Sequence, residues 1–167
     1  LGGAAATVAS AEAPSWTRHL VLVDPAIHLA DRDRDVVRAS QERAFADTSV
    51  SAIRAEHPGW HDLDVELKAV AAQQASRYAV EQTSAQNTPW DVRGAASRLA
   101  VPTRVIAGDP DVYSIFTGDL AAEVLQNPVI SMAVVPGTGH SPHRDAPDAA
   151  AAALLDAIAA WPVEVSA

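Results

Sequence analysis

The sequence contains no cysteine, and this absence excludes disulfide bonds, thiolate catalysis and cysteine-ligated zinc. Lys68 is its only lysine and the net charge is -9 at pH 7, which argues against the clustered basic residues that nucleic-acid binding requires. No apolar run approaches the roughly 20 residues that span a bilayer, so we expect no membrane span. We expect a cytoplasmic protein, and the composition leaves secretion open.

Short apolar runs and helical periodicity alternate over much of the chain. The apolar runs predict buried strands at residues 19–24, 103–107 and 129–135. The run of small residues from Ala4 to Ala11 predicts a helix that ends at Pro14. Residues 88–91 predict a helix start, and further helices are expected at 115–125 and 145–160. Helices between successive strands imply right-handed crossovers and a parallel sheet, which is the α/β class. Three strands leave much sheet edge uncovered, so we expect the chain to form part of a larger sheet.

One segment departs from this alternation. It contains helical patterns at residues 31–46, 48–57 and 62–82, with no strand between them. We therefore predict a helical cap or lid at 29–88, inserted into a core made of residues 1–28 and 89–167.

Two polar turns follow neighbouring strands of the predicted sheet. Asp109 and Asp111 come after the strand at 103–107, and His140 comes after the strand at 129–135, in the run Gly-Thr-Gly-His. Each turn alone is typical of an ordinary loop. Because the carboxyl ends of parallel strands lie at one edge of a sheet, we expect the acid and the histidine to meet there. A carboxylate can then orient the imidazole for proton transfer.

The order of these turns resembles the second half of an α/β-hydrolase, in which the acid and then the histidine follow the nucleophile. The stretch Val101–Gly108 is similar to the acid-bearing strand of that family, and Val134–His143 is similar to its histidine loop. The resemblance implies Asp111 as the acid, with Asp109 in reserve, and His140 as the base. His143 is then part of the loop structure.

The G-x-S-x-G motif of this family is absent from the sequence. The opening Leu1-Gly2-Gly3 resembles the residues that follow the nucleophile serine, so the resemblance places that serine immediately before Leu1. The backbone N–H of Leu1 would then belong to the oxyanion hole. A leucine at this position favours serine over the aspartate nucleophile of dehalogenase-like members, which is commonly followed by tryptophan.

The resemblance implies a hydrolase of ester (acyl) bonds with a Ser-His-Asp mechanism, and we expect no cofactor or metal. Its partners would be a small-molecule ester or acyl substrate and the missing N-terminal half of the same hydrolase. Trp60 and Trp90 are candidates for a substrate pocket, although aromatic residues more often serve packing. Two alternatives remain open: a non-catalytic ligand-binding module or inactive fragment, and a cofactor-free perhydrolase, haloperoxidase or C–C hydrolase with the same triad.

Overall fold

The computed structural model describes residues 1–161 and divides them into two compact units. The first unit consists of Leu1–His28 together with the chain from Asp91 onward, and the second consists of Leu29–Trp90. The first unit contains the sheet, and the second is helical. Each unit is described by itself below.

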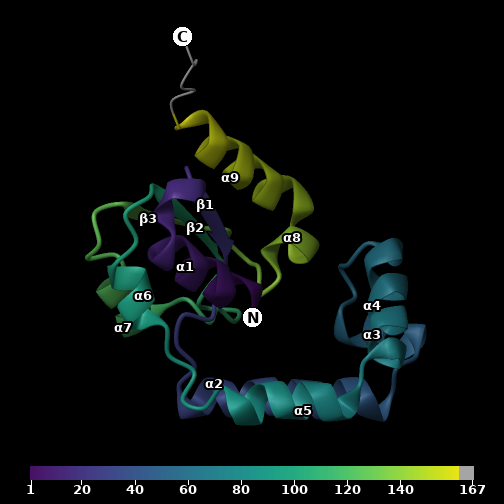
Figure 1. The fold of residues 1–167 in the computed structure, drawn as a ribbon. Coiled ribbons are helices and arrows are strands. Elements are labelled where there is room, and N and C mark those ends of the chain that lie inside the picture. Colours follow the sequence, from purple (N-terminus) through teal and green to yellow (C-terminus); the bar gives the residue numbers. More distant parts are fainter. Residues whose placement is uncertain (162–167) are drawn as a thin grey trace. The chain divides into compact units, whose positions relative to one another are not determined.

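A parallel sheet in the order β1-β2-β3 forms the centre of the first unit (Figure 1). Its strands are β1 (Leu20–Val23), β2 (Thr103–Ala107) and β3 (Ile130–Val134). The three predicted strands and their parallel pairing are therefore confirmed. In register, Leu22 pairs with Val105 and Val105 with Met132, so the three strands end at the same edge.

Helices cover both faces of this sheet. On one face, α1 (Gly2–Glu12) contacts β1 and α6 (Arg93–Ser97), and α6 contacts α7 (Gly118–Val124). On the other face, α9 (Pro147–Ala159) packs against β2 and follows the short α8 (Pro142–Asp145) (Figure 1). A 3-10 turn at Pro14–Trp16 joins α1 to β1, where the predicted helix end at Pro14 is confirmed.

The core of the first unit lies between the sheet and the face that carries α1 and α7. Side chains alternate along a strand, so Leu22, Val105 and Ile130 all point to this face. Phe116, which is 1% exposed, packs with them. Removing a buried phenylalanine side chain typically costs about 3–5 kcal/mol, so this residue anchors the loop that precedes α7.

Two predicted helix starts are wrong. No helix begins at residues 88–91, and α6 starts only at Arg93, where the Asp91 carboxylate accepts the Arg93 N–H at 3.0 Å. The helix expected from Ile115 begins instead at Gly118. The backbone N–H groups of Ile115 and Phe116, which precede α7, donate to the Asp24 carboxylate.

The second unit contains α2 (Asp31–Ala46), α3 (Val50–Glu56), α4 (Asp62–Gln74) and α5 (Arg77–Gln86). The prediction for α2 is confirmed at both ends. The helix expected at 62–82 is broken at Ala75 and Ser76 into α4 and α5, because the Ser76 hydroxyl caps a new helix by accepting the Ala79 N–H at 3.3 Å.

A small core of its own holds α3 and α4 together in the second unit. It consists of Ile53, Trp60, Val65 and Ala69. Trp60 is 6% exposed and stacks on His57, with ring centroids 3.8 Å apart. The Arg77 guanidinium, at the start of α5, lies 5.8 Å from the centre of the Phe45 ring, near the end of α2.

Within residues 1–161, no helix is both long enough and apolar enough to cross a membrane.

Candidate active site

The end of β1 carries a carboxylate that is removed from solvent. Asp24 is 0% exposed, and its backbone has a φ of 38°, in the left-handed region. Aspartate tolerates this conformation better than most residues, and the turn aims its side chain into the protein. Pro25 follows and prevents the strand from continuing.

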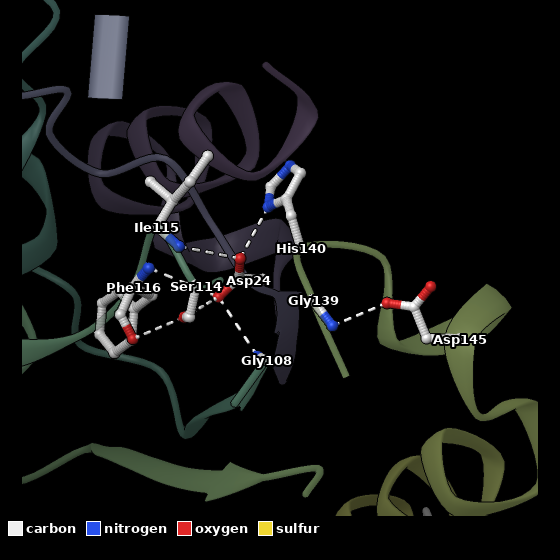
Figure 2. Close-up of polar contacts among 8 residues, drawn as sticks. All are labelled: Asp24, Gly108, Ser114, Ile115, Phe116, Gly139, His140 and Asp145. Carbon is white, nitrogen blue, oxygen red and sulfur yellow. Dashed lines mark hydrogen bonds and ion pairs between the residues drawn. The ribbon is translucent and has the colours of Figure 1, made fainter. Parts of the chain in front are cut away.

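The loop after β2 surrounds the Asp24 carboxylate with hydrogen-bond donors (Figure 2). Oδ1 accepts the Ser114 hydroxyl at 2.5 Å, the Gly108 N–H at 3.3 Å and the Phe116 N–H at 3.4 Å. Oδ2 accepts the Ile115 N–H at 3.1 Å. A buried carboxylate is stable only when hydrogen-bond donors compensate its charge, and the loop after β2 supplies these donors to Asp24.

His140 completes the set of groups around Asp24. Its Nδ1 lies 2.7 Å from Asp24 Oδ2, and its side chain is 48% exposed while that of Asp24 is 0% exposed. The ionised carboxylate accepts a hydrogen bond from Nδ1–H, so the neutral imidazole carries its free lone pair on Nε2. One ring nitrogen is thus fixed by a buried charge, and the other is left to act as a proton acceptor, as a general base requires.

The charge state of Asp24 follows from two opposed effects. Burial raises the pKa of Asp24, because the charged form loses its hydration. The hydrogen bonds from His140, Ser114 and Ile115 outweigh burial and hold this pKa below the usual range of aspartate. Asp24 is therefore ionised at neutral pH, and its charge would stabilise a protonated His140 ring.

The structure pairs His140 with Asp24, and with neither Asp111 nor Asp109, the two residues that the sequence suggested as the acid. Asp111 is exposed, and its backbone N–H donates to Asp109 Oδ1 at 2.9 Å. Asp109 Oδ2 accepts the Gly137 N–H at 2.7 Å. The turn after β2 therefore directs its N–H groups toward Asp24 and uses one of its own carboxylates to hold the histidine loop.

A signal for Asp24 was present in the sequence. The run Val23-Asp24-Pro25 ends a continuous apolar strand, as the run from Gly108 to Asp111 does, and both strands end at the same edge of the sheet. The argument that selected Asp109 and Asp111 applies equally to Asp24. Sequence alone does not show which of the three carboxylates is buried, because that depends on where the N–H groups of the loop point.

The other predicted site residues are Leu1, Trp60 and Trp90. Leu1 is the residue before the first turn of α1, its carbonyl accepts the Ala5 N–H at 3.1 Å, and its side chain is exposed. Trp60 is a core residue of the second unit, and this burial does not support the expected place in a substrate pocket. Trp90 is half-buried, and its carbonyl accepts the Leu29 N–H at 3.1 Å.

No cluster of three or more metal-ligating side chains occurs in residues 1–161. A surface hollow of about 380 Å³ lies beside α6 and α7 in the first unit, but its lining contains neither His140 nor Asp24. In it, Arg93 pairs with Glu123 at 3.2 Å, and the Asn127 side chain donates to the carbonyls of Ala96 and Leu99. These contacts are structural and cap the end of α6.

Comparison with known proteins places this geometry in a fold. No protein-family model matches the sequence, and no curated protein matches it. Among solved structures, an N-formylmaleamic acid deformylase from Pseudomonas putida S16 is similar, with a TM-score of 0.70, 20% identity, and 90% of this chain and 61% of that chain covered. An E-2-(acetamidomethylene)succinate hydrolase gives a TM-score of 0.72 and 19% identity over 95% of this chain and 64% of that chain.

A third similar structure is an α/β-hydrolase enzyme from a Medee basin deep-sea metagenome library. Its TM-score is 0.68 and its identity 15%, with 99% of this chain and 65% of that chain covered. The chain thus spans somewhat less than two thirds of the length of these three structures, which is consistent with a C-terminal portion of their fold. The parallel sheet, its flanking helices and these similarities together show that the chain has the α/β-hydrolase fold.

Proposed function

We propose that this chain belongs to a hydrolase of ester (acyl) bonds that works by a Ser-His-Asp mechanism. His140 is the general base, and Asp24 takes the place that the sequence suggested for Asp111. The serine is expected immediately before Leu1. The observation that supports this proposal most strongly is the 2.7 Å contact between a half-exposed imidazole and a fully buried, ionised carboxylate at the edge of a parallel sheet.

The proposed reaction begins when the serine oxygen attacks the acyl carbon and His140 Nε2 accepts the serine proton. The protonated ring then gives this proton to the leaving alcohol as the bond between the acyl carbon and the alcohol oxygen breaks. Water then attacks the acyl carbon of the acyl-enzyme while His140 Nε2 accepts its proton. The ring returns this proton to the serine oxygen as the acyl–serine bond breaks and the carboxylic acid leaves. Asp24 stays ionised throughout, holds Nδ1 and stabilises the positive charge on the ring.

The backbone N–H of Leu1 is proposed as one oxyanion donor. Leu1 precedes the first turn of α1, where backbone N–H groups have no partner within the helix. A donor of this kind contributes roughly 2.7–4 kcal/mol to transition-state stabilisation in enzymes of this class. The second donor would come from the preceding part of the protein.

We also propose that the first unit pairs with that preceding part. Among the described strands, β1 pairs with β2 alone, and Val23 at its end is 42% exposed. A further strand on the open edge of β1 would complete a larger sheet. The second unit, residues 29–90, is proposed as the cap of this hydrolase.

The substrate range is tested best with a panel of acyl groups. The similar structures include a deformylase and a thioesterase domain from the curacin biosynthetic pathway, which has a TM-score of 0.55, 20% identity, and 90% of this chain and 61% of that chain covered. The panel should therefore contain a short p-nitrophenyl ester, an acyl thioester and a formamide. We expect the ester to be hydrolysed fastest.

The decisive experiment uses the protein that includes the residues preceding Leu1. We expect His140→Ala to abolish hydrolysis of p-nitrophenyl acetate, whereas His143→Ala, a matched change three residues later on α8, should retain it. A fluorophosphonate probe should label the serine before Leu1 in the wild type and label it far more slowly in His140→Ala. Full hydrolysis by His140→Ala would rule out the assigned base.

A further inference from the structure

The segment that leads to His140 is held by two carboxylates from outside it. The Gly137 N–H donates to Asp109 Oδ2 at 2.7 Å, and the Gly139 N–H donates to Asp145 Oδ2, also at 2.7 Å (Figure 2 shows the second contact). Asp109 comes from the turn after β2 and Asp145 from the last residue of α8. Two different elements thus grip the backbone on either side of Thr138.

Both carboxylates are themselves fixed. Asp109 Oδ1 accepts the Asp111 N–H at 2.9 Å, and the Asp109 N–H donates to the Thr138 carbonyl at 2.8 Å. The Asp145 N–H donates to the Ser141 carbonyl at 3.0 Å within the short helix α8. Hydrogen bonds to ionised carboxylates are stronger than those between neutral groups, so each contact is an effective restraint.

Close packing removes the remaining freedom of the segment. A methyl group added at Gly108 would lie 2.3 Å from the Gly139 carbonyl oxygen, so the turn after β2 touches the histidine loop backbone to backbone. Thr138 is 1% exposed, and its hydroxyl donates to the Val135 carbonyl at 2.7 Å. The loop cannot shift toward β2 without breaking one of these contacts.

We propose that Asp109 and Asp145 are positioning residues that hold His140 against Asp24. This rests on the proposed function, because it assigns both residues to the same general base. The His140 ring is half-exposed and bonded to Asp24 through one nitrogen, so its placement depends on the backbone that carries it. Two carboxylates that fix the N–H groups one and three residues before His140 define that backbone.

The experiment replaces each carboxylate in the complete protein, including the residues before Leu1. Asp109→Ala and Asp145→Ala remove the acceptor, whereas Asp109→Asn and Asp145→Asn keep an acceptor oxygen. Asp148→Ala, an exposed carboxylate in the first turn of α9, is the matched control. Amide hydrogen exchange reports the grip on Gly137 and Gly139, and the low-field Nδ1 proton resonance of His140 reports its contact with Asp24.

We expect exchange at Gly137 in Asp109→Ala, and at Gly139 in Asp145→Ala, to become at least about tenfold faster than in the wild type. The His140 Nδ1 resonance should weaken or move, and kcat for the ester should fall about 10- to 100-fold with little change in KM. The asparagine variants should recover most of both signals, and Asp148→Ala should match the wild type.

The two proposals fail in different ways. If the alanine variants exchange faster but keep the wild-type His140 resonance and kcat, the carboxylates only stabilise the loop and the positioning role is wrong. If exchange and the His140 resonance respond as expected but no variant, including the wild type, hydrolyses any acyl substrate, the positioning role stands and the proposed function fails.

Discussion

The ends of β1 and β2 present aspartates at the same edge of one sheet, and the structure uses them in opposite ways. Asp24, after β1, is fully buried and accepts hydrogen bonds from the loop that follows β2. Asp111, after β2, is exposed and contributes its backbone N–H to that same loop. The segment after β1 therefore supplies the buried charge, and the loop after β2 supplies the donors, although the two strand ends have similar sequences.

This comparison shows that a carboxylate becomes an orienting group through the donors that face it. Burying an isolated charge is costly, and Asp24 is stable because its two oxygens accept four hydrogen bonds from one loop and one from His140. Asp111 lies in water, where a charge needs no such loop.

The largest effect is expected for Asp24→Asn. The amide would present N–H groups to donors and would no longer fix the tautomer of His140, so kcat/KM for the ester should fall about 10³- to 10⁴-fold. The measurement is steady-state hydrolysis by the complete protein. A larger loss in Asp111→Asn than in Asp24→Asn would reverse the assignment of the two strand ends.

The next effect is expected for Ser114→Ala, which removes the hydroxyl 2.5 Å from Asp24 Oδ1. A hydrogen bond to a buried charge contributes about 1.5–3 kcal/mol, so the free energy of unfolding should fall by this amount in denaturant titrations. Ser131→Ala is the matched control. Its hydroxyl makes a long bond of 3.4 Å to the Thr103 carbonyl, and its removal should cost less than about 0.5 kcal/mol.

Lowering the pH should remove the contribution that ionised Asp24, at the end of β1, makes to the free energy of unfolding. Because the pKa of Asp24 is lower in the folded protein than in the unfolded chain, its contribution to stability is present above the unfolded value of about 3.9. That contribution is lost as the pH falls through the folded pKa. Between about pH 5 and pH 2, the wild type should therefore lose more unfolding free energy than Asp24→Asn does. Equal losses in the two proteins would contradict a lowered pKa at Asp24.

The smallest effect is expected for Asp111→Ala. The substitution keeps the backbone N–H that Asp109 accepts and removes only an exposed carboxylate. The free energy of unfolding should change by no more than about 0.5 kcal/mol, and ester hydrolysis should stay at the wild-type rate. A marked loss of activity would show that the second strand end has a role that its exposure does not reveal.

The contrast between the two strand ends also shows which features the sequence could predict and which it could not. Continuous apolar runs bounded by prolines predicted β1, β2 and β3, because a buried parallel strand needs such a run. In the structure His140 pairs with the strand-end carboxylate of Asp24 and not with that of Asp111. The sequence does not show this choice, because it depends on where the donors at residues 114–116 lie in the folded loop.

The second unit shows a related limit. The periodicity of apolar residues predicted both ends of α2. The break between α4 and α5 was missed because the Ser76 cap acts on the backbone, which the pattern of apolar residues does not report. Trp60 was considered for a pocket, yet it fills a small core with Ile53 and Val65. At the α4–α5 break a local hydrogen bond, and at Trp60 burial, gave a result that the sequence pattern did not predict.

The most direct test of the pairing of Asp24 with His140 is the His140 Nδ1 proton resonance in three proteins. The wild type should show it at low field, as expected for a hydrogen bond to a buried carboxylate. Asp24→Asn should lose or strongly shift the signal, and Asp111→Asn should leave it in place. A signal that persists in Asp24→Asn and disappears in Asp111→Asn would contradict the pairing seen in the structure.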